Sequence, residues 1–125
     1  MTFPPRLDKE LAELREQYAI ETVEEKESII LVIQGFQLGD GFTKSASDLL
    51  LQIPRSYPDA GPDMFWVDED VRLASGELPQ AAEATTEIHG RIRRRFSWHR
   101  ARWNPTIDNL HGHLEFIRKR LREKK

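Results

Sequence analysis

The sequence predicts an α+β fold in which a meander of four antiparallel strands carries a helix at each end. Apolar residues recur at helical spacing near both ends of the chain, over residues 7–18 and 107–121. Between them lie four segments of strand-like composition, separated by turn residues: 19–24, 28–36, 48–53 and 64–67. Strands that follow one another through such turns usually pair with their sequence neighbours, and the two apolar helix faces then pack on the resulting sheet.

The length and composition set the outer limits of what the chain can be. At 125 residues it is expected to form a single domain, residues 1–125, that needs neither a metal nor a disulfide to fold. Cysteine is absent, which excludes disulfides, thiolate metal sites and thiol catalysis. No apolar run approaches the roughly 20 residues of a membrane span, and the amino terminus lacks a signal-peptide pattern. We therefore expect a cytoplasmic protein that has no membrane partner.

Charge is distributed unevenly along the chain although the net charge is only −2. Residues 1–90 hold 7 basic and 18 acidic side chains, whereas residues 91–125 hold 12 basic and 3 acidic ones, which gives −11 and +9. The basic third can attract an acidic protein surface or nucleic acid, or it can pair with the acidic side chains of the same chain.

The first helix is predicted to be amphipathic. Four side chains share its inner face at helical spacing: Leu7, Leu11, Leu14 and Tyr18. Its outer face carries three glutamates, Glu10, Glu13 and Glu16. We expect this outer face to be exposed, with the inner face packed on the sheet.

The strands are predicted from their side-chain patterns. Segment 28–36 contains Ile29-Ile30-Leu31-Val32-Ile33, which is apolar on both faces and therefore indicates a central strand that is covered on both sides. In segment 48–53, three apolar residues fall on one face of the expected strand: Leu49, Leu51 and Ile53. These two segments form the second and third strands of the predicted meander.

A corner at residues 57–62 joins the third strand to the fourth. Pro58 and Pro62 each fix their own φ and push the preceding residue out of the helical region, which stops the third strand. Asp, Ala and Gly at positions 59–61 supply turn chemistry, and the aromatic run that follows prefers a strand. We expect this corner to pack against Trp103.

Residues 68–103 form the least regular part, with a short helix predicted over 80–86. Three aromatic residues near its end indicate packed rather than disordered chain. The final helix is predicted to begin with Asn104 as its cap and Pro105 at its first position. Five apolar residues then fall on one helical face: Ile107, Leu110, Leu114, Ile117 and Leu121.

Two motifs in this order resemble the ubiquitin-conjugating enzyme family and its inactive RWD relatives. The first is a strand that ends in proline, followed by Tyr-Pro, a second proline and an aromatic strand, with these residues: Tyr57, Pro58, Gly61, Pro62 and Phe65. The second is Trp103-Asn104-Pro105, which is similar to the Trp-x-Pro that follows the active-site loop of conjugating enzymes. The whole chain resembles a prokaryotic branch of this superfamily that is associated with bacterial ubiquitin-like systems.

The resemblance implies a fold like that of the conjugating enzymes but not their chemistry. In that family the catalytic cysteine lies shortly before Trp-x-Pro and follows a His-Pro-Asn motif, and both are absent here. Thioester transfer needs a thiolate, so the chain cannot perform it. The resemblance therefore implies a non-thiol adaptor that uses no cofactor and binds an activating enzyme or a ubiquitin-like protein. Conjugating enzymes dock such partners on the outer face of the first helix, commonly through basic residues. The resemblance thus implies that Glu10, Glu13 and Glu16 bind a partner, and their acidic charge favours a basic one.

Two other functions compete with the adaptor. Ser97 could act as an oxygen nucleophile that forms an ester, with His99 as its base, although such a serine also needs a third group to orient the base. Alternatively the chain is a plain RWD-type interaction module. The genes that neighbour this one would separate these functions, because a pathway member is expected beside an activating enzyme or a deconjugating protease.

The carboxyl-terminal third offers further candidate binding residues. Arg93, Arg94 and Arg95 belong to a basic stretch that we expect to face solvent and bind an acidic partner. The same stretch has the cations and rings used for single-stranded nucleic acid, but the rings fall in the predicted core, so nucleic acid is not expected as a partner. His111 and His113 are two residues apart on a helix and do not share a face, so no metal site is predicted.

Overall fold

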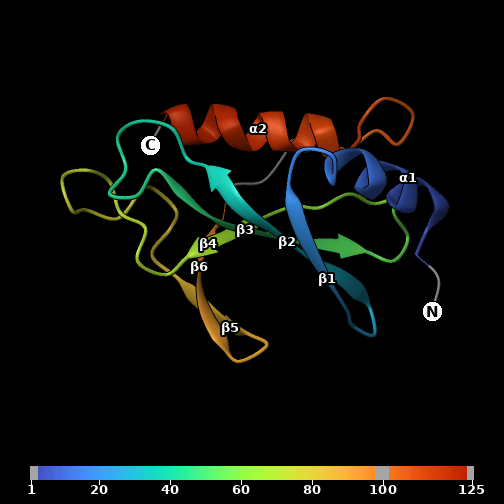
Figure 1. The fold of residues 1–125 in the computed structure, drawn as a ribbon, viewed down its shortest axis with the longest axis horizontal. Helices are drawn as coiled ribbons and strands as arrows, with labels where there is room; N and C mark the ends of the chain where they lie inside the picture. Colours follow the sequence, from blue (N-terminus) through green and yellow to red (C-terminus); the bar gives the residue numbers. More distant parts are fainter. Residues whose placement is uncertain (1–2, 98–101, 124–125) are drawn as a thin grey trace.

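The computed structural model describes residues 3–97 and 102–123 (Figure 1). It has two helices and six strands in the order α1 (Pro5–Leu14), β1 (Ala19–Glu24), β2 (Ser28–Gln37), β3 (Ala46–Pro54), β4 (Phe65–Asp68), β5 (Thr85–Ile88), β6 (Arg91–Phe96) and α2 (Leu110–Glu123). The α+β class and the four predicted strands are confirmed, each within two residues of its predicted ends.

The sheet has six strands rather than the four predicted, in the order β1-β2-β3-β4-β6-β5, and all its described pairings are antiparallel. The two additional strands form a hairpin in the region that was expected to be irregular. The prediction of a short helix over residues 80–86 is wrong. His89 and Gly90 join β5 to β6 with positive φ angles of 51° and 79°, as a two-residue hairpin turn requires. β6 then pairs with β4 through four residue pairs.

Both helices lie on the same side of the sheet and cover its main core (Figure 1). The inner faces of α1 and α2 contact alternate residues of β2 and β3, including Leu31 and Leu51, both fully buried. Phe65 of β4 stacks on Phe96 of β6 at a ring distance of 4.8 Å, which extends this core beneath the added hairpin. The prediction that the amphipathic helices pack on the sheet is therefore confirmed.

The other side of the sheet carries a second, smaller apolar cluster made of Ile30, Val32, Leu50 and Trp66. Val23 of β1 and Ile88 of β5 pack against it, although these two strands form opposite edges of the sheet. The His89 Nε2 atom lies 3.1 Å from Glu25 Oε2, so the β5–β6 turn meets the β1–β2 turn across this face. The central strand β2 is thus buried on both faces, as predicted.

The final helix begins later than predicted. Residues 104–109 form a separate turn in which Asn104 Oδ1 accepts hydrogen bonds from the Thr106 backbone N–H and hydroxyl, at 3.0 and 2.7 Å. Asn109 is the residue that caps α2, since its Oδ1 accepts the Gly112 N–H at 2.8 Å. Ile107 consequently does not join the apolar face of α2, and it is 73% exposed. The described helices include none that is long and apolar enough to cross a membrane.

Candidate functional site

The predicted corner at residues 57–62 packs against Trp103, as expected. The Trp103 Nε1 atom donates a hydrogen bond of 2.7 Å to the Pro58 carbonyl oxygen, and the Tyr57 and Trp103 rings lie 5.8 Å apart. Gly61 lies directly against the indole, because a Cβ atom added there would be 2.2 Å from Trp103 Cδ2. Glycine is therefore required at this position by the close approach of the ring. The two motifs that carry the resemblance form one contiguous unit.

Glu10 connects this unit to both helices from a buried position. Its Oε1 atom accepts hydrogen bonds from the Tyr57 hydroxyl, at 2.5 Å, and from the Leu110 N–H at the start of α2, at 2.8 Å. Its Oε2 atom accepts the Arg6 Nε–H at 2.8 Å. Burial raises the pKa of the Tyr57 phenol, and the hydrogen bond to Glu10 raises it further. The phenol is therefore held as a donor to the carboxylate.

The expectation that Glu10 lies on an exposed partner-binding face is wrong, since Glu10 is only 4% exposed. It falls one residue before Leu11 and so lies at the edge of the inner face of α1, where buried donors surround it. Glu13 and Glu16 are exposed as expected. Glu13 lies 2.9 Å from His111 Nε2 on α2, so one of these two carboxylates already has a partner within the chain.

His111 and His113 do not come together in the fold. His113 is fully buried and stacks on Phe116, while His111 is partly exposed beside α1, so the two rings point in different directions from α2. Within residues 3–97 and 102–123 there is no group of three side chains that could hold a metal ion.

Ser97 follows β6, and its N–H donates to the Ala81 carbonyl oxygen at 3.0 Å. Its proposed base, His99, lies outside the described residues.

Arg93 and Arg94 do not face solvent, which corrects the expectation that they form a partner-binding surface. Arg93 Nη1 lies 3.4 Å from Asp48 and 3.8 Å from Asp68, on the side of the sheet away from the helices. Arg94 points to the opposite side, and its Nη1 and Nε atoms donate to the Ala82 and Glu69 carbonyl oxygens, each at 2.8 Å. Burial lowers the pKa of the Arg94 guanidinium. Both cations act inside the chain.

The third arginine of the basic run, Arg95, is half-buried. It stands opposite Trp66 in the β4–β6 register and so belongs to the side of the sheet that carries the second cluster. The three consecutive arginines therefore alternate between the two sides, as residues of a strand must. A single surface that contains all three is excluded by this alternation.

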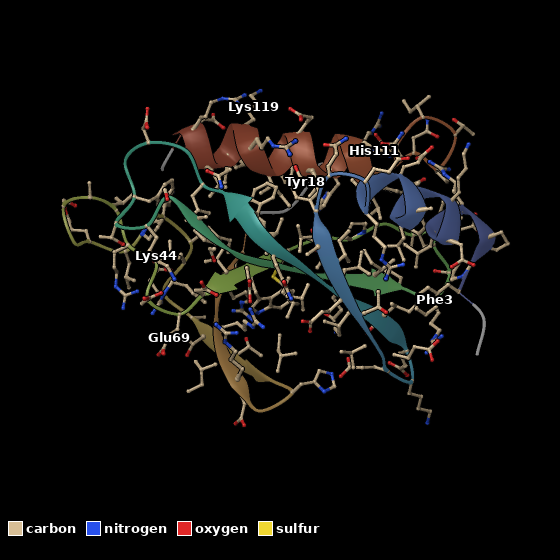
Figure 2. All side chains as sticks on the ribbon, in the orientation of Figure 1. Phe3, Tyr18, Lys44, Glu69, His111 and Lys119 are labelled. Carbon is tan, nitrogen blue, oxygen red and sulfur yellow. The ribbon has the colours of Figure 1, made fainter. Side chains whose placement is uncertain are left out.

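A polar network lies beside the β5–β6 hairpin, in the region where Figure 2 shows Lys44 and Glu69. Lys44 Nζ lies 2.8 Å from Asp68 and 3.1 Å from Asp70, and the hydrogen bond to Asp68 raises the pKa of Lys44. For Asp68, burial alone would raise the pKa, but Lys44 and the charge of Arg91 outweigh it and lower the pKa. Cations and carboxylates balance one another here, so this network is structural.

A groove of about 320 Å³ lies on the same side as the second cluster, next to the corner. We call it the corner groove, and its lining residues are Glu27, Ser28, Gln52, Pro54, Gly61, Asp63, Met64 and Trp66. The sequence analysis missed it. The sequence contained one indication of this groove. Met64 and Trp66 alternate with Phe65 and Val67, so the first two side chains point to the side of the sheet away from the helices.

Comparison with known protein families gives a match over most of the chain. Residues 5–124 match the family model described as "Prokaryotic E2 family E". No curated protein and no solved structure matches the chain. The match covers nearly the whole chain, including the corner, Trp103 and both helices.

Proposed function

The chain belongs to prokaryotic E2 family E, and we propose on this basis that it works in a bacterial ubiquitin-like modification pathway as a non-thiol adaptor. E2 designates the ubiquitin-conjugating enzymes, so membership agrees with the resemblance read from Tyr57-Pro58 and Trp103-Asn104-Pro105. It also relates the chain in general to proteins of ubiquitin-like pathways. We further propose that residues 1–125 form one domain with a fold like that of the conjugating enzymes.

The observation that carries the adaptor role is the absence of cysteine from the entire sequence. Conjugating enzymes pass a ubiquitin-like protein between thioesters, which needs a thiolate of low pKa and high nucleophilicity. In this chain the corner and Trp103-Asn104-Pro105 persist, joined by a 2.7 Å hydrogen bond from Trp103 to the Pro58 carbonyl oxygen, while His-Pro-Asn and the thiol have no counterpart. A chain of this kind can bind pathway proteins without carrying the modifier covalently.

The proposed partner is an activating enzyme or a ubiquitin-like protein, and the exposed face of α1 is the proposed contact. Glu13 and Glu16 remain on that face, whereas Glu10 is withdrawn into the interior. This face thus offers two carboxylates to a partner, and the Glu13 carboxylate also lies 2.9 Å from His111 Nε2. A basic patch on the partner fits this face.

A second candidate is a conjugating factor that forms an oxygen ester through Ser97. The observation that favours it is the position of Ser97, which directly follows Phe96, the residue of β6 that pairs with Phe65 at the start of β4. Ser97 is half-buried there, next to the segment that precedes Trp103. This position corresponds to the part of the chain where the family carries its nucleophile.

One incubation separates the two candidates. The protein is mixed with an activating enzyme, a ubiquitin-like protein of a bacterial pathway and nucleotide, and both covalent adducts and non-covalent complexes are measured. The adaptor role predicts a complex with no adduct, and it predicts that Glu13→Gln with Glu16→Gln weakens the complex while Glu87→Gln on β5 does not. A hydroxide-sensitive adduct that is absent from Ser97→Ala would establish the enzyme instead. Binding to neither protein would leave an unrelated RWD-type module.

A further inference from the structure

We propose that the corner groove is a binding site for an extended peptide segment that inserts a lysine or arginine side chain. This inference goes beyond the adaptor role, because it concerns a different side of the molecule from α1 and does not depend on which pathway protein binds there. Both helices lie on one side of the sheet (Figure 1), and the groove is lined by Met64 and Trp66, which belong with the second cluster on the other side.

The wall of the groove contains a buried polar group that lacks a partner. Trp66 lines the groove and is 6% exposed, and its indole Nε1–H has no hydrogen-bond acceptor among the described residues. A buried donor without an acceptor costs roughly 1 to 3 kcal/mol, so native structures rarely leave one. Met64, which packs against the same cluster, is the flexible side chain beside it. When Met64 turns aside, a carbonyl oxygen of an inserted peptide can accept this hydrogen.

The rim of the groove is acidic. The Glu27 side chain is exposed and forms no ion pair with the part of the chain that the structure describes. Arg55 follows the groove residue Pro54 in the chain, but its guanidinium is turned toward the β1–β2 turn, where it lies 3.8 Å from Glu24 and donates to the Glu25 carbonyl oxygen at 2.5 Å. The Glu27 carboxylate therefore favours a cation over an anion at this rim.

The groove also offers polar groups suited to a peptide backbone. Gln52 Nε2 and Ser28 Oγ are 3.4 Å apart, and Ser28 Oγ is 3.4 Å from Glu25 Oε1. These hydrogen bonds are long, so the Gln52 amide keeps both donor and acceptor capacity for a ligand. An amide of this kind can pair with a backbone N–H and C=O of an extended chain.

The shape selects an extended peptide rather than a small cation. β3 and β4 share a single register pair, Leu50 with Trp66, so the two strands have separated where Gln52 faces Met64 across the groove. A volume of about 320 Å³ accommodates one long side chain together with adjacent backbone. A lysine or arginine fits best, because its apolar stem can lie on Met64 and Trp66 while its charged end reaches Glu27.

The test is a titration of ¹⁵N-labelled full-length protein with the acetylated, amidated peptide Gly-Gly-Lys-Gly-Gly, followed by NMR. A second peptide carries glutamate and a third carries norleucine in place of lysine. The Trp66 indole resonance is assigned with Trp66→Phe. We expect the lysine peptide to shift this indole resonance and the Gln52 side-chain amide saturably, and we expect 0.5 M NaCl to weaken the binding.

Matched variants locate the charge. Glu27→Gln should weaken binding of the lysine peptide about two- to fivefold, because it removes one partly screened ion pair, whereas Glu87→Gln on β5 should not change it. The site is wrong if all three peptides give the same shifts, if the lysine peptide leaves the Trp66 indole unmoved, or if both glutamine variants bind alike. A site that fails in this way leaves the adaptor role untouched, since no pathway protein is present.

Discussion

The Tyr57 hydroxyl donates a hydrogen bond of 2.5 Å to Glu10, a carboxylate 47 residues earlier in the chain. The same Glu10 oxygen accepts the Leu110 N–H, 100 residues later. α1, the corner and the amino terminus of α2 therefore meet at one carboxylate, which also suits the positive end of the α2 dipole. Trp103, whose ring packs on Tyr57, is positioned by this meeting point even though it does not touch Glu10.

Replacing Glu10 should destabilise the fold far more than replacing its neighbour on the same helix. Glu10→Gln keeps the shape but removes the charge, so the buried Tyr57 hydroxyl and the half-buried Arg6 guanidinium lose a strong acceptor. We expect a loss of about 1 to 3 kcal/mol in urea unfolding. Glu13→Gln is the matched control and should change stability by less than about 0.5 kcal/mol. Equal effects of the two changes would contradict the assigned role of Glu10.

Gly61→Ala should be destabilising because its Cβ atom would overlap the Trp103 indole, with Cδ2 only 2.2 Å away. Forcing the ring to move should cost about 1 to 3 kcal/mol and disturb its hydrogen bond to Pro58. Gly112→Ala in α2 is the control, since its new Cβ atom meets Asn109 at an ordinary 3.5 Å and alanine favours helix. The control should be neutral or stabilising by thermal denaturation. A Gly61→Ala protein as stable as this control would show that Trp103 does not press on the corner.

The buried arginines should matter for folding. Arg94→Ser leaves the Ala82 and Glu69 carbonyl oxygens without their donor, and we expect a loss of about 1 to 3 kcal/mol. Arg91→Ser is the exposed control from the same strand, with contacts of 3.4 Å to Asp48 and Asp68, and should cost at most about 1 kcal/mol. Chemical denaturation measures both. If Arg94→Ser were as stable as wild type, the two hydrogen bonds from the Arg94 side chain to backbone carbonyl oxygens would not stabilise the fold.

The Lys44 and Asp68 pair should make stability fall in acid. Because the pKa of Asp68 is lower in the folded protein than in the unfolded chain, the stabilisation is present above the ordinary aspartate pKa of about 3.9. It is lost as the pH falls through the lower pKa of the folded state, where the carboxylate takes up a proton. Unfolding free energies measured from pH 6 to pH 2 should therefore decline less steeply in Asp68→Asn. Parallel profiles for the two proteins would refute this.

The contact between the β5–β6 and β1–β2 turns can be tested by cross-linking, because the chain has no cysteine of its own. Glu25→Cys combined with His89→Cys replaces two side chains whose ends are 3.1 Å apart. Cysteine is shorter than glutamate or histidine, so we expect a short bis-maleimide reagent to join the pair within one molecule, visible as a shift on electrophoresis. Glu25→Cys combined with Glu77→Cys is the control, because no contact is described between these two positions. Equal cross-linking of the two pairs would show that the turns do not meet.

The secondary structure that could be predicted from the sequence is that which depends on local periodicity. The placement of Leu49, Leu51 and Ile53 on one strand face specifies which face joins the main core. The helical spacing of Leu7, Leu11 and Leu14 does the same for α1. The proline pair at the corner fixes backbone angles in the same local way. The absence of cysteine needs no structure at all, and it excludes thioester chemistry by itself.

The β5–β6 hairpin and the place of its arginines were decided by tertiary contacts. Arg93 is stable in the interior only because Asp48 and Asp68 come from two other strands, and Arg94 because distant carbonyl oxygens receive its hydrogen bonds. Neither set of partners lies close in sequence, so the basic run looked like solvated surface. Glu10 follows the same rule, since a buried carboxylate is tolerated only where the fold brings donors to it. Local sequence thus determined which face each element buries, and long-range pairing decided which charges could go inside.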